Sequence, residues 1–463
     1  MKHFTHQSSF FTIKALYTLL FGVAVLLFFG LAYPHHLHYQ EQYQLFLFDS
    51  AYLWDIVKQP GGVADMLGRF CTQFFLFAWV GALMIAVLLM LVQLLVLRLA
   101  NYGWLYGLSF VPSFLLWLFL LDENALMGGV WAVLLTLLAI NVCLLMPKGW
   151  GRRIAILIII PILYWMVGPA LSGSHYHRYP TVTPSLLYAT WLSAIILPLL
   201  VRVCHKWVSA SRPLISHLLP LLLLIVMGTF VWKNANFKAE KVMQYDFMAR
   251  YQQWNRILET INAEKPNNQI GVTVQNLALG MRGLLVDHLF EYRQNGIAGL
   301  LPDVQRDATS PLPTAEAFYQ LGMINMAQRT VFEAQESILD FQKSGRCYKR
   351  LAQTNLINGN YEVARKYLLA LKKTLFYSEW ADETLQLLGN EEAIAQHPEY
   401  GRLRQLSYTE DYYFGDSVTP EMLETLFFNH TENRLAYEYL VAYYMLTGDR
   451  DSYEKLLLQL QEK

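Results

Sequence analysis

Seven long stretches without a charged side chain divide the first half of this chain. They contain no Asp, Glu, Lys or Arg, and they cover residues 15–33, 71–97, 102–121, 125–147, 154–173, 183–201 and 213–232. A helix of about 20 apolar residues crosses the roughly 30 Å hydrocarbon core of a bilayer. Hydrophobic residues make up 54% of the chain and charged residues only 16%, a balance typical of membrane proteins. The sequence predicts a membrane domain over residues 1–233, a helix bundle with about seven spans.

The loops between these stretches differ in their content of Lys and Arg, which predicts the orientation. One alternating set of loops holds nine of these residues, Lys2, Lys14, Arg98, Lys148, Arg152, Arg153, Arg202, Lys206 and Arg212, and the other set holds three, Lys58, Arg69 and Arg178. Cytoplasmic loops carry the excess of positive charge, so we expect a cytoplasmic N-terminus. Seven crossings then place residues 234–463 on the far side, which is the periplasm for a bacterial inner membrane. The short stretch from Trp104 to Leu121 is the weakest crossing, and its loss would move this second domain into the cytoplasm.

The net charge of zero hides a difference between the two domains. Residues 1–233 hold 13 Lys and Arg against 6 Asp and Glu, whereas residues 234–463 hold 23 against 30. Nucleic acids and anionic lipid head groups attract clustered positive charge. We therefore expect no nucleic-acid partner for the mildly acidic second domain.

The second domain has the pattern of helices, and a helical period with charges on one face begins at FKAEKVMQYDF. Three stretches in it share an aromatic residue, a Leu three positions on and a turn: residues 318–339, 348–371 and 437–460. They resemble the tetratricopeptide repeat, a helix pair in which small residues such as Ala334 and Ala364 stand where the helices touch. The third stretch departs from the pattern because it has Tyr453 at the small position.

This resemblance implies an all-α repeat domain with a protein partner. Repeats of this kind bury their apolar faces against each other and form a curved surface that receives peptides or proteins. The segment YTEDYYFGD offers Tyr412, Tyr413 and Phe414 as an interaction surface. The alternative is that these three aromatic side chains fill a gap where a repeat is interrupted.

Residues 34–70 form the longest loop of the membrane domain, and its sequence allows two interpretations. QLFLFDSAYLWDIV and VADMLGRF each fit an amphipathic helix in the membrane interface, on either side of the breaker PGG at 60–62. Tyr and Trp favour the head-group layer. The first interpretation is therefore a collar that contacts membrane lipids and carries out no chemistry.

The second interpretation is an enzyme site at the outer face. Its candidate catalytic acids are Glu41, Asp49, Asp55, Asp122 and Glu123. Such carboxylates can hold a divalent cation with a lipid-linked phosphate, and one of them can act as general base. The layout is similar to membrane glycosyltransferases that use lipid-phosphate sugars, which implies that donor and a divalent cation. The loops of the membrane domain contain no DxD or ExD motif, so this resemblance rests on loop position.

A third alternative is a metal site made of histidines. His35, His36 and His38 follow the first apolar stretch, and His175 and His177 lie in a loop expected on the same face. Histidines at a water edge ligate zinc or copper, but a histidine that caps the end of an interfacial helix is more common. The chain has no phosphate-binding glycine loop and no GxSxG, HExxH or CxxC motif. No cofactor is expected outside these alternatives, and catalytic activity stays open.

One resemblance covers most of the chain. HYQEQYQLFLFDSAYLWDIVKQPGGVADMLGRFCTQFF at residues 38–75, followed by several apolar stretches and a helical tail, resembles an uncharacterised family of bacterial multi-pass membrane proteins. The resemblance implies an inner-membrane location and supplies no activity. We expect an inner-membrane protein that presents a helical-repeat domain to the periplasm, as a scaffold or accessory factor in envelope assembly. The glycosyltransferase is the alternative.

Overall fold

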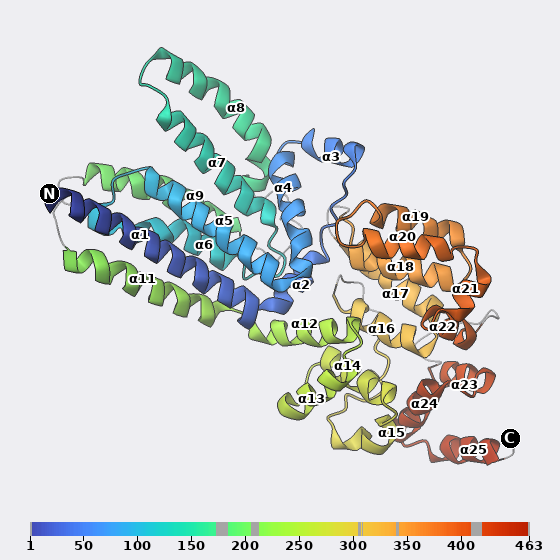
Figure 1. Cartoon of the computed structure of the whole chain (residues 1–463). Helices are drawn as coiled ribbons and strands as arrows, with labels where there is room; N and C mark the ends of the chain where they lie inside the picture. The colour runs from blue at the N-terminus through green and yellow to red at the C-terminus, as the bar shows by residue number, and fades with distance from the viewer. Residues whose placement is uncertain are drawn as a thin grey trace. The chain divides into compact units, whose positions relative to one another are not determined.

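The chain folds into helices that form two compact units. The computed structural model describes residues 2–172, 184–204, 213–303, 307, 309–338, 342–408 and 419–461. Over these residues every long regular element is a helix, which confirms the all-α prediction. The first unit is Met1–Glu240 and the second unit is Lys241–Lys463 (Figure 1). Their division falls within helix α12, Phe237–Arg250, a few residues after the boundary expected at residue 233.

Five helices of the first unit are long and apolar enough to cross a membrane: Ile13–Ala32, Ala78–Arg98, Met127–Leu145, Trp150–Gly168 and Ser185–Val203. They belong to α1 (Lys2–Leu27) with the π-helical turn η1 (Phe28–Ala32), α5 (Ala78–Arg98), α7 (Met127–Leu145), α8 (Trp150–Ser172) and α9 (Pro184–Val203). A sixth candidate arises if α11 (Pro213–Asn234) and α12, which are bent by 64°, count as one span. By length and composition, the described part of the chain is that of a multi-pass membrane protein.

The stretch expected to cross at residues 102–121 forms a shorter apolar helix, Gly103–Phe119. It consists of the 3-10 helix η3 (Gly103–Phe110) and the α-helix α6 (Val111–Phe119), and Pro112 stands in the first turn of α6. Proline lacks a backbone N–H and fits an α-helix best in its first turn, which explains why α6 begins at this point. The expected total of seven crossings depends on this helix.

The long loop after α1 folds into α2 (Pro34–Glu41), α3 (Ser50–Val57), α4 (Gly62–Thr72) and the 3-10 helix η2 (Gln73–Leu76). The two helices expected around the PGG breaker are therefore present as α3 and α4. α4 packs against α7 and α8 instead of lying alone in an interface, and a Cβ at Gly68 would come within 2.4 Å of the Gly128 backbone N. α5 begins at Ala78, later than the expected residue 71, because the chain is extended at Phe77.

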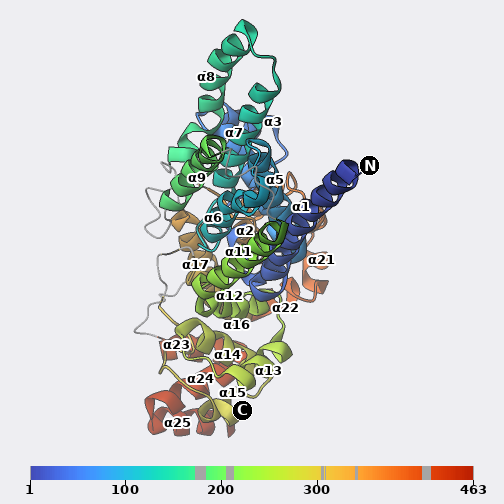
Figure 2. The same cartoon turned by 90° about the vertical axis from the view of Figure 1, so that its left-hand side faces the viewer.

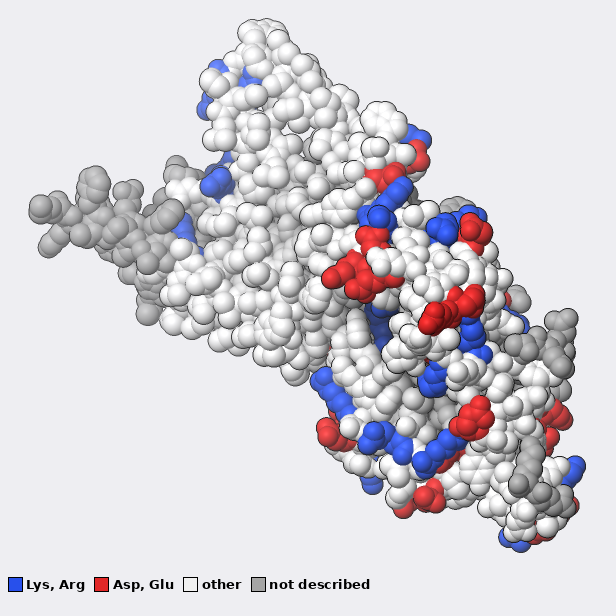
Figure 3. Space-filling view, turned by 45° about the vertical axis from the view of Figure 1, so that its right-hand side comes forward, with Lys and Arg blue, Asp and Glu red and all other residues white. Residues whose placement is uncertain are grey.

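Hydrogen bonds between side chains join three helices inside the first unit. Thr18 Oγ1 donates to Gln93 Oε1 (2.9 Å), and Gln93 Nε2 donates to Ser109 Oγ (2.9 Å). These residues lie on α1, α5 and η3, and α1 also lies beside α11 in both ribbon views (Figures 1 and 2). The surface of this unit is nearly free of charged side chains on the face seen in Figure 3. Interhelical polar contacts of this kind stabilise bundles whose outside faces lipid.

The second unit continues after α12 as a series of helices: α13 (Trp254–Glu264), α14 (Gln269–Met281), α15 (Leu285–His288), η5 (Leu289–Glu291), α16 (Pro311–Leu321), α17 (Ile324–Ser337), α18 (Gly345–Ile357), α19 (Tyr361–Leu371), α20 (Ser378–Leu387), α21 (Glu391–Gln396), α22 (Tyr400–Leu406), α23 (Thr419–Asn429), α24 (Arg434–Thr447) and α25 (Arg450–Gln461). From α16 to α20 each helix packs against the next one in the chain. This arrangement buries apolar side chains between neighbours in sequence, which is how a helical stack is built.

The three stretches selected for their repeated pattern all form helix pairs: α16 with α17, α18 with α19, and α24 with α25. In each pair the turn contains a glycine with positive φ, namely Gly322 (90°), Gly359 (76°) and Gly448 (72°). Glycine enters this left-handed region without steric cost and so ends helices. Ala334 and Ala364 are 1% and 0% exposed, which agrees with their predicted place at helix contacts.

Candidate functional site

The first helix of the loop, α2, receives its N-terminal cap from a distant part of the first unit. The Glu240 carboxylate accepts the backbone N–H groups of His35 (2.7 Å) and His36 (2.8 Å), one on each oxygen. The first N–H groups of a helix have no partner within the helix, and a carboxylate there also complements the helix dipole. Burial raises the pKa of Glu240 to about 7, against the lowering effect of these two hydrogen bonds.

α2 also holds the loop between α6 and α7. The imidazole of His36 is fully buried, and its Nε2 bonds to the Leu120 carbonyl (2.9 Å). Burial lowers the pKa of His36 to about 3, so the ring is neutral and Nε2 carries the proton that it donates. Gln40 Nε2 donates to the carbonyls of Asp122 (3.2 Å) and Ala125 (3.1 Å). α2 is therefore the element on which several loops of the first unit converge.

Two more contacts bring other helix ends to the same place. The backbone N–H of Asn236, just after α11, donates to the Tyr33 hydroxyl (3.2 Å). The N–H of Gly61 donates to the carbonyl of Trp165 near the end of α8 (2.6 Å). The ends of α1, α6, α8 and α11 thus meet around the residue 34–72 loop. Elsewhere in the unit, Arg202 at the end of α9 donates to the Leu99 carbonyl at the end of α5.

The five candidate catalytic acids have different surroundings. Asp49 caps α3 by accepting the Tyr52 N–H (3.0 Å), Asp55 pairs with Lys58, and Asp122 accepts the Asn124 N–H (2.9 Å). Burial raises the pKa of Asp122. Glu41 is buried at the end of α2, and Glu123 adjoins Asp122 in the loop.

The described carboxylates and histidines do not assemble a metal site. His35 and His38 lie close, with ring centres 5.8 Å apart, whereas His36 packs on Tyr33 and bonds to Leu120. Over the described ranges, no three His, Cys, Asp or Glu side chains are placed to hold a metal ion. His175 and His177 lie outside the described residues. The glycosyltransferase stays a prediction, and this geometry adds no observation in its favour.

The α3 region has the exposure expected of an interfacial collar. Trp54 on α3 is 67% exposed, and Phe48 just before α3 is 52% exposed. Large aromatic side chains are rarely left this open to water, and they favour the head-group layer of a bilayer. The polar side chains at this place pair locally, since Arg69 bonds to Asp65 (2.6 Å) on the same helix. The collar interpretation of the loop stays a prediction.

The second unit contains a cluster of charged side chains that sequence reasoning did not single out. Arg346 on α18 forms two hydrogen bonds with Asp246 on α12 (2.5 and 2.9 Å), and its Nη2 lies 3.8 Å from Glu316 on α16. Arg350, one turn further along α18, bonds to Glu316 (2.5 Å). We call Asp246, Glu316, Arg346 and Arg350 the buried charge cluster, because their side chains are at most 16% exposed. The sequence signal was GRCYKRL, which places two arginines one helical turn apart.

Aromatic rings border this cluster. The Arg350 guanidinium lies 3.6 Å from the centre of the Tyr319 ring, and Lys349 Nζ lies 4.7 Å from the centre of the Trp380 ring. Arg250 on α12 donates to the Tyr377 hydroxyl (3.0 Å). Cations over aromatic faces are stabilised by the ring quadrupole, more strongly where water is excluded. The predicted interaction surface of Tyr412, Tyr413 and Phe414 lies outside the described residues.

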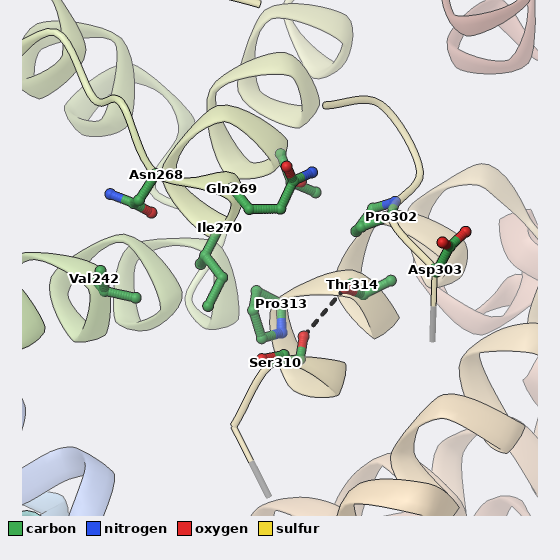
Figure 4. Close-up of a pocket in the computed structure, with 10 residues that line it drawn as sticks. Val242, Asn268, Gln269, Ile270, Pro302, Asp303, Ser310, Pro313 and Thr314 are labelled. Atoms are coloured by element: carbon green, nitrogen blue, oxygen red, sulfur yellow. Dashed lines mark hydrogen bonds between the residues drawn. The ribbon is translucent and has the colours of Figure 1, made fainter. Parts of the chain in front are cut away.

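A cavity of about 330 Å³ opens between α12, α14 and α16 (Figure 4). Val242, Ile270 and Pro313 contribute apolar surface, and Thr314 Oγ1 at its edge donates to the Ser310 carbonyl (3.1 Å). Among the described residues that line it, Asp303 is the one ionisable side chain. The described lining is therefore mainly apolar and neutral polar.

The described elements form an all-α protein, and the length and composition of its apolar helices indicate the multi-pass membrane class. A model described as "Family of unknown function (DUF6057)" matches residues 9–173 and 169–463. These two matches cover nearly the whole chain, and the protein belongs to this family. No curated protein and no solved structure matches it.

Proposed function

We propose that this protein crosses a bacterial inner membrane seven times, with a cytoplasmic N-terminus. It then presents the second unit to the periplasm as a tetratricopeptide-like repeat domain that binds a protein partner, in a scaffold or accessory role in envelope assembly. The observation that carries the topology is the meeting of helix ends around α2. Suppose that seven elements each cross the membrane once: α1, α5, η3 with α6, α7, α8, α9 and α11. The C-terminal ends of α1, α6, α8 and α11 then belong to the same side of the membrane.

The contacts support this alternation at both faces. Glu240 follows α11, Leu120 follows α6, and Trp165 lies in the C-terminal half of α8. All three are bonded to residues within 35–61. Leu99 and Arg202, which follow α5 and end α9, are bonded to each other. An odd number of crossings between the N-terminus and Glu240 is the count that satisfies both sets of contacts.

Partner binding is supported by the helix stack and by its charges. Helical stacks expose an extended surface made from successive repeats, and this surface commonly receives peptides or proteins. The buried charge cluster lies on α12, α16 and α18, and the half-buried Lys349 and Trp380 at its border lie on α18 and α20, so several helices support one site at the surface. A purely structural stack would gain as much from apolar side chains there.

Reporter fusions test the topology. Alkaline phosphatase and a cytoplasmically fluorescent protein are fused after Gln59, Asn124, Ser174 and Lys463 of the full chain, with a fusion after Lys148 as the cytoplasmic control. We expect active phosphatase at the first four sites and fluorescence at the control. Fluorescence at Lys463 would place the second unit in the cytoplasm and overturn the proposal.

Photo-crosslinking in cells tests partner binding. A benzoylphenylalanine replaces Trp380 beside the charged cluster, or replaces Val363, which is 43% exposed on α19. We expect an envelope protein to cross-link at position 380 and not at position 363. Equal cross-linking at both positions, or none at position 380, would contradict a partner surface at this cluster.

A further inference from the structure

Lys349 stands beside the buried charge cluster without a carboxylate of its own. It is half-buried on α18, between Arg346 and Arg350 in sequence, and its Nζ faces the Trp380 ring. Among the residues that the structure describes, no Asp or Glu oxygen lies within 4 Å of this Nζ. An ammonium group in such a place is available to an anion that comes from outside the chain.

The neighbouring charges favour that anion. Burial, followed by the positive charges of Arg250 and Arg350, lowers the pKa of Lys349 to about 8, and the acids Glu399 and Glu316 oppose this effect. Glu316 is already bonded to Arg350, and Asp246 is bonded to Arg346. The repulsion felt by Lys349 therefore exceeds the attraction, and a bound anion would relieve it.

The aromatic side chains at this place limit the kind of anion. The Trp380 ring covers one side of Lys349, and Tyr377, which is 8% exposed, bonds to Arg250. A Cβ at Gly345 would come within 2.6 Å of the Tyr377 ring, so the start of α18 lies directly on this ring. Two cations beside two fixed rings suit a ligand that combines a carboxylate with an aromatic or apolar side chain.

We propose that Lys349, with Arg250 and Trp380, binds a carboxylate of an acidic peptide segment that belongs to the partner. This inference rests on the proposed partner-binding function and names the chemistry of the partner. An acidic peptide is favoured over an anionic membrane because residues 234–463 hold 30 Asp and Glu against 23 Lys and Arg. A broad anionic surface would be repelled by that excess, whereas one peptide carboxylate meets only the local cations.

Peptide binding to the purified full-length protein in detergent tests the proposal. The probe is a fluorescein-labelled 12-residue peptide with one central Glu among Tyr and Ser residues, and its control replaces that Glu with Gln. We expect the Glu peptide to bind, with a dissociation constant roughly tenfold lower than that of the Gln peptide. Lys349→Gln should weaken binding of the Glu peptide about tenfold, Lys349→Arg should restore most of it, and Lys366→Gln on the exposed face of α19 should leave it unchanged.

A second readout reports on the lysine itself. Because its pKa is lowered, Lys349 should be acylated faster at pH 8 than Lys366, and the bound Glu peptide should protect it. Equal binding by wild type and Lys349→Gln, equal binding of the Glu and Gln peptides, or displacement of the peptide by phosphatidylserine vesicles would each overturn the proposal. Because the peptide is added to purified protein, its binding is measured independently of the cellular cross-linking. If a partner cross-links at position 380 but binds equally well to the Lys349→Gln variant, the partner-binding function stands and the Lys349 site is wrong.

Discussion

Arg346 and Asp246 form a two-point ion pair inside the second unit, with N–O distances of 2.5 and 2.9 Å and side chains 7% and 16% exposed. Removing one partner of such a pair leaves a buried charge uncompensated, which typically costs about 3–5 kcal/mol. We expect Arg346→Met to lower the thermal unfolding midpoint of the purified protein strongly. Combining it with Asp246→Leu should recover part of the loss. Arg365→Met, which breaks an exposed pair with Glu362, is the matched control and should change little.

Glu240 and His36 should give the first unit opposite dependences on pH. The pKa of Glu240 is raised from its ordinary 4.5 to about 7, so its contribution to stability is complete below pH 4.5 and is lost as the pH rises through 7. The pKa of His36 is lowered from 6.5 to about 3, so its contribution is complete above pH 6.5 and is lost as the pH falls. Between pH 4.5 and 6.5 the two effects oppose each other.

The variant Glu240→Gln separates the pH effect of Glu240 from that of His36. Without the carboxyl group, acidification from pH 7 to 5 should destabilise the variant more than the wild type, by roughly 2–3 kcal/mol. The unfolding midpoint is followed by Trp fluorescence across this range. Glu362→Gln, at an 86% exposed side chain, should run parallel to the wild type. If the unfolding midpoints of Glu240→Gln and the wild type change equally with pH, the raised pKa of Glu240 is contradicted.

Gly68 and Gly128 mark a close approach of α4 and α7. Because an added Cβ at residue 68 would lie 2.4 Å from backbone, Gly68→Ala must push the two helices apart, at a cost of about 1–3 kcal/mol or more. Gly228→Ala on α11 meets nothing within 4 Å and should be neutral or slightly stabilising, because Ala favours helices over Gly. A urea or heat titration that ranks these two variants equally would show that the helices can separate freely.

Gln93 bonds to both Thr18 and Ser109 and is 1% exposed. Replacing it with Leu keeps the volume and removes both interhelical bonds, so we expect a loss of about 1 kcal/mol. Thr229→Val removes a hydroxyl that bonds within its own helix, to the Val226 carbonyl, and should cost less. Both variants are compared by thermal unfolding in the same detergent, and an equal loss would remove the special role of Gln93.

Local patterns in the sequence were enough to predict the helix pairs of the second unit. Gly322, Gly359 and Gly448 each sit between two runs of helical period, and a left-handed glycine is a chemical requirement that the sequence displays directly. The same holds for the apolar stretches, since length and absence of charge are local properties. The change from 3-10 to α geometry between η3 and α6 was not predicted, because the effect of Pro112 depends on its register in the first turn of α6.

The contacts of Glu240 and Asp246 could not be predicted, because each joins elements far apart in the chain. Glu240 belongs to FKAEK, which reads as an ordinary solvated helix face, yet its carboxylate is 204 residues from the His36 N–H that it accepts. Asp246 and Arg346 are likewise 100 residues apart. A single sequence shows which residues carry charge and gives no signal for the partner of each charge. The candidate acids were selected by loop position alone, and the structure gives Asp49, Asp55 and Asp122 separate local partners.

The cap on α2 has a consequence for biogenesis. A chain made from its N-terminus exposes α2 early, while Glu240 is synthesised 204 residues after His36. At roughly 5–20 residues per second, the wait is roughly 10–40 s. During that interval the helix has an open end that membrane-insertion factors or proteases can recognise. The cap on α2 can therefore form only after the chain has been synthesised through Glu240.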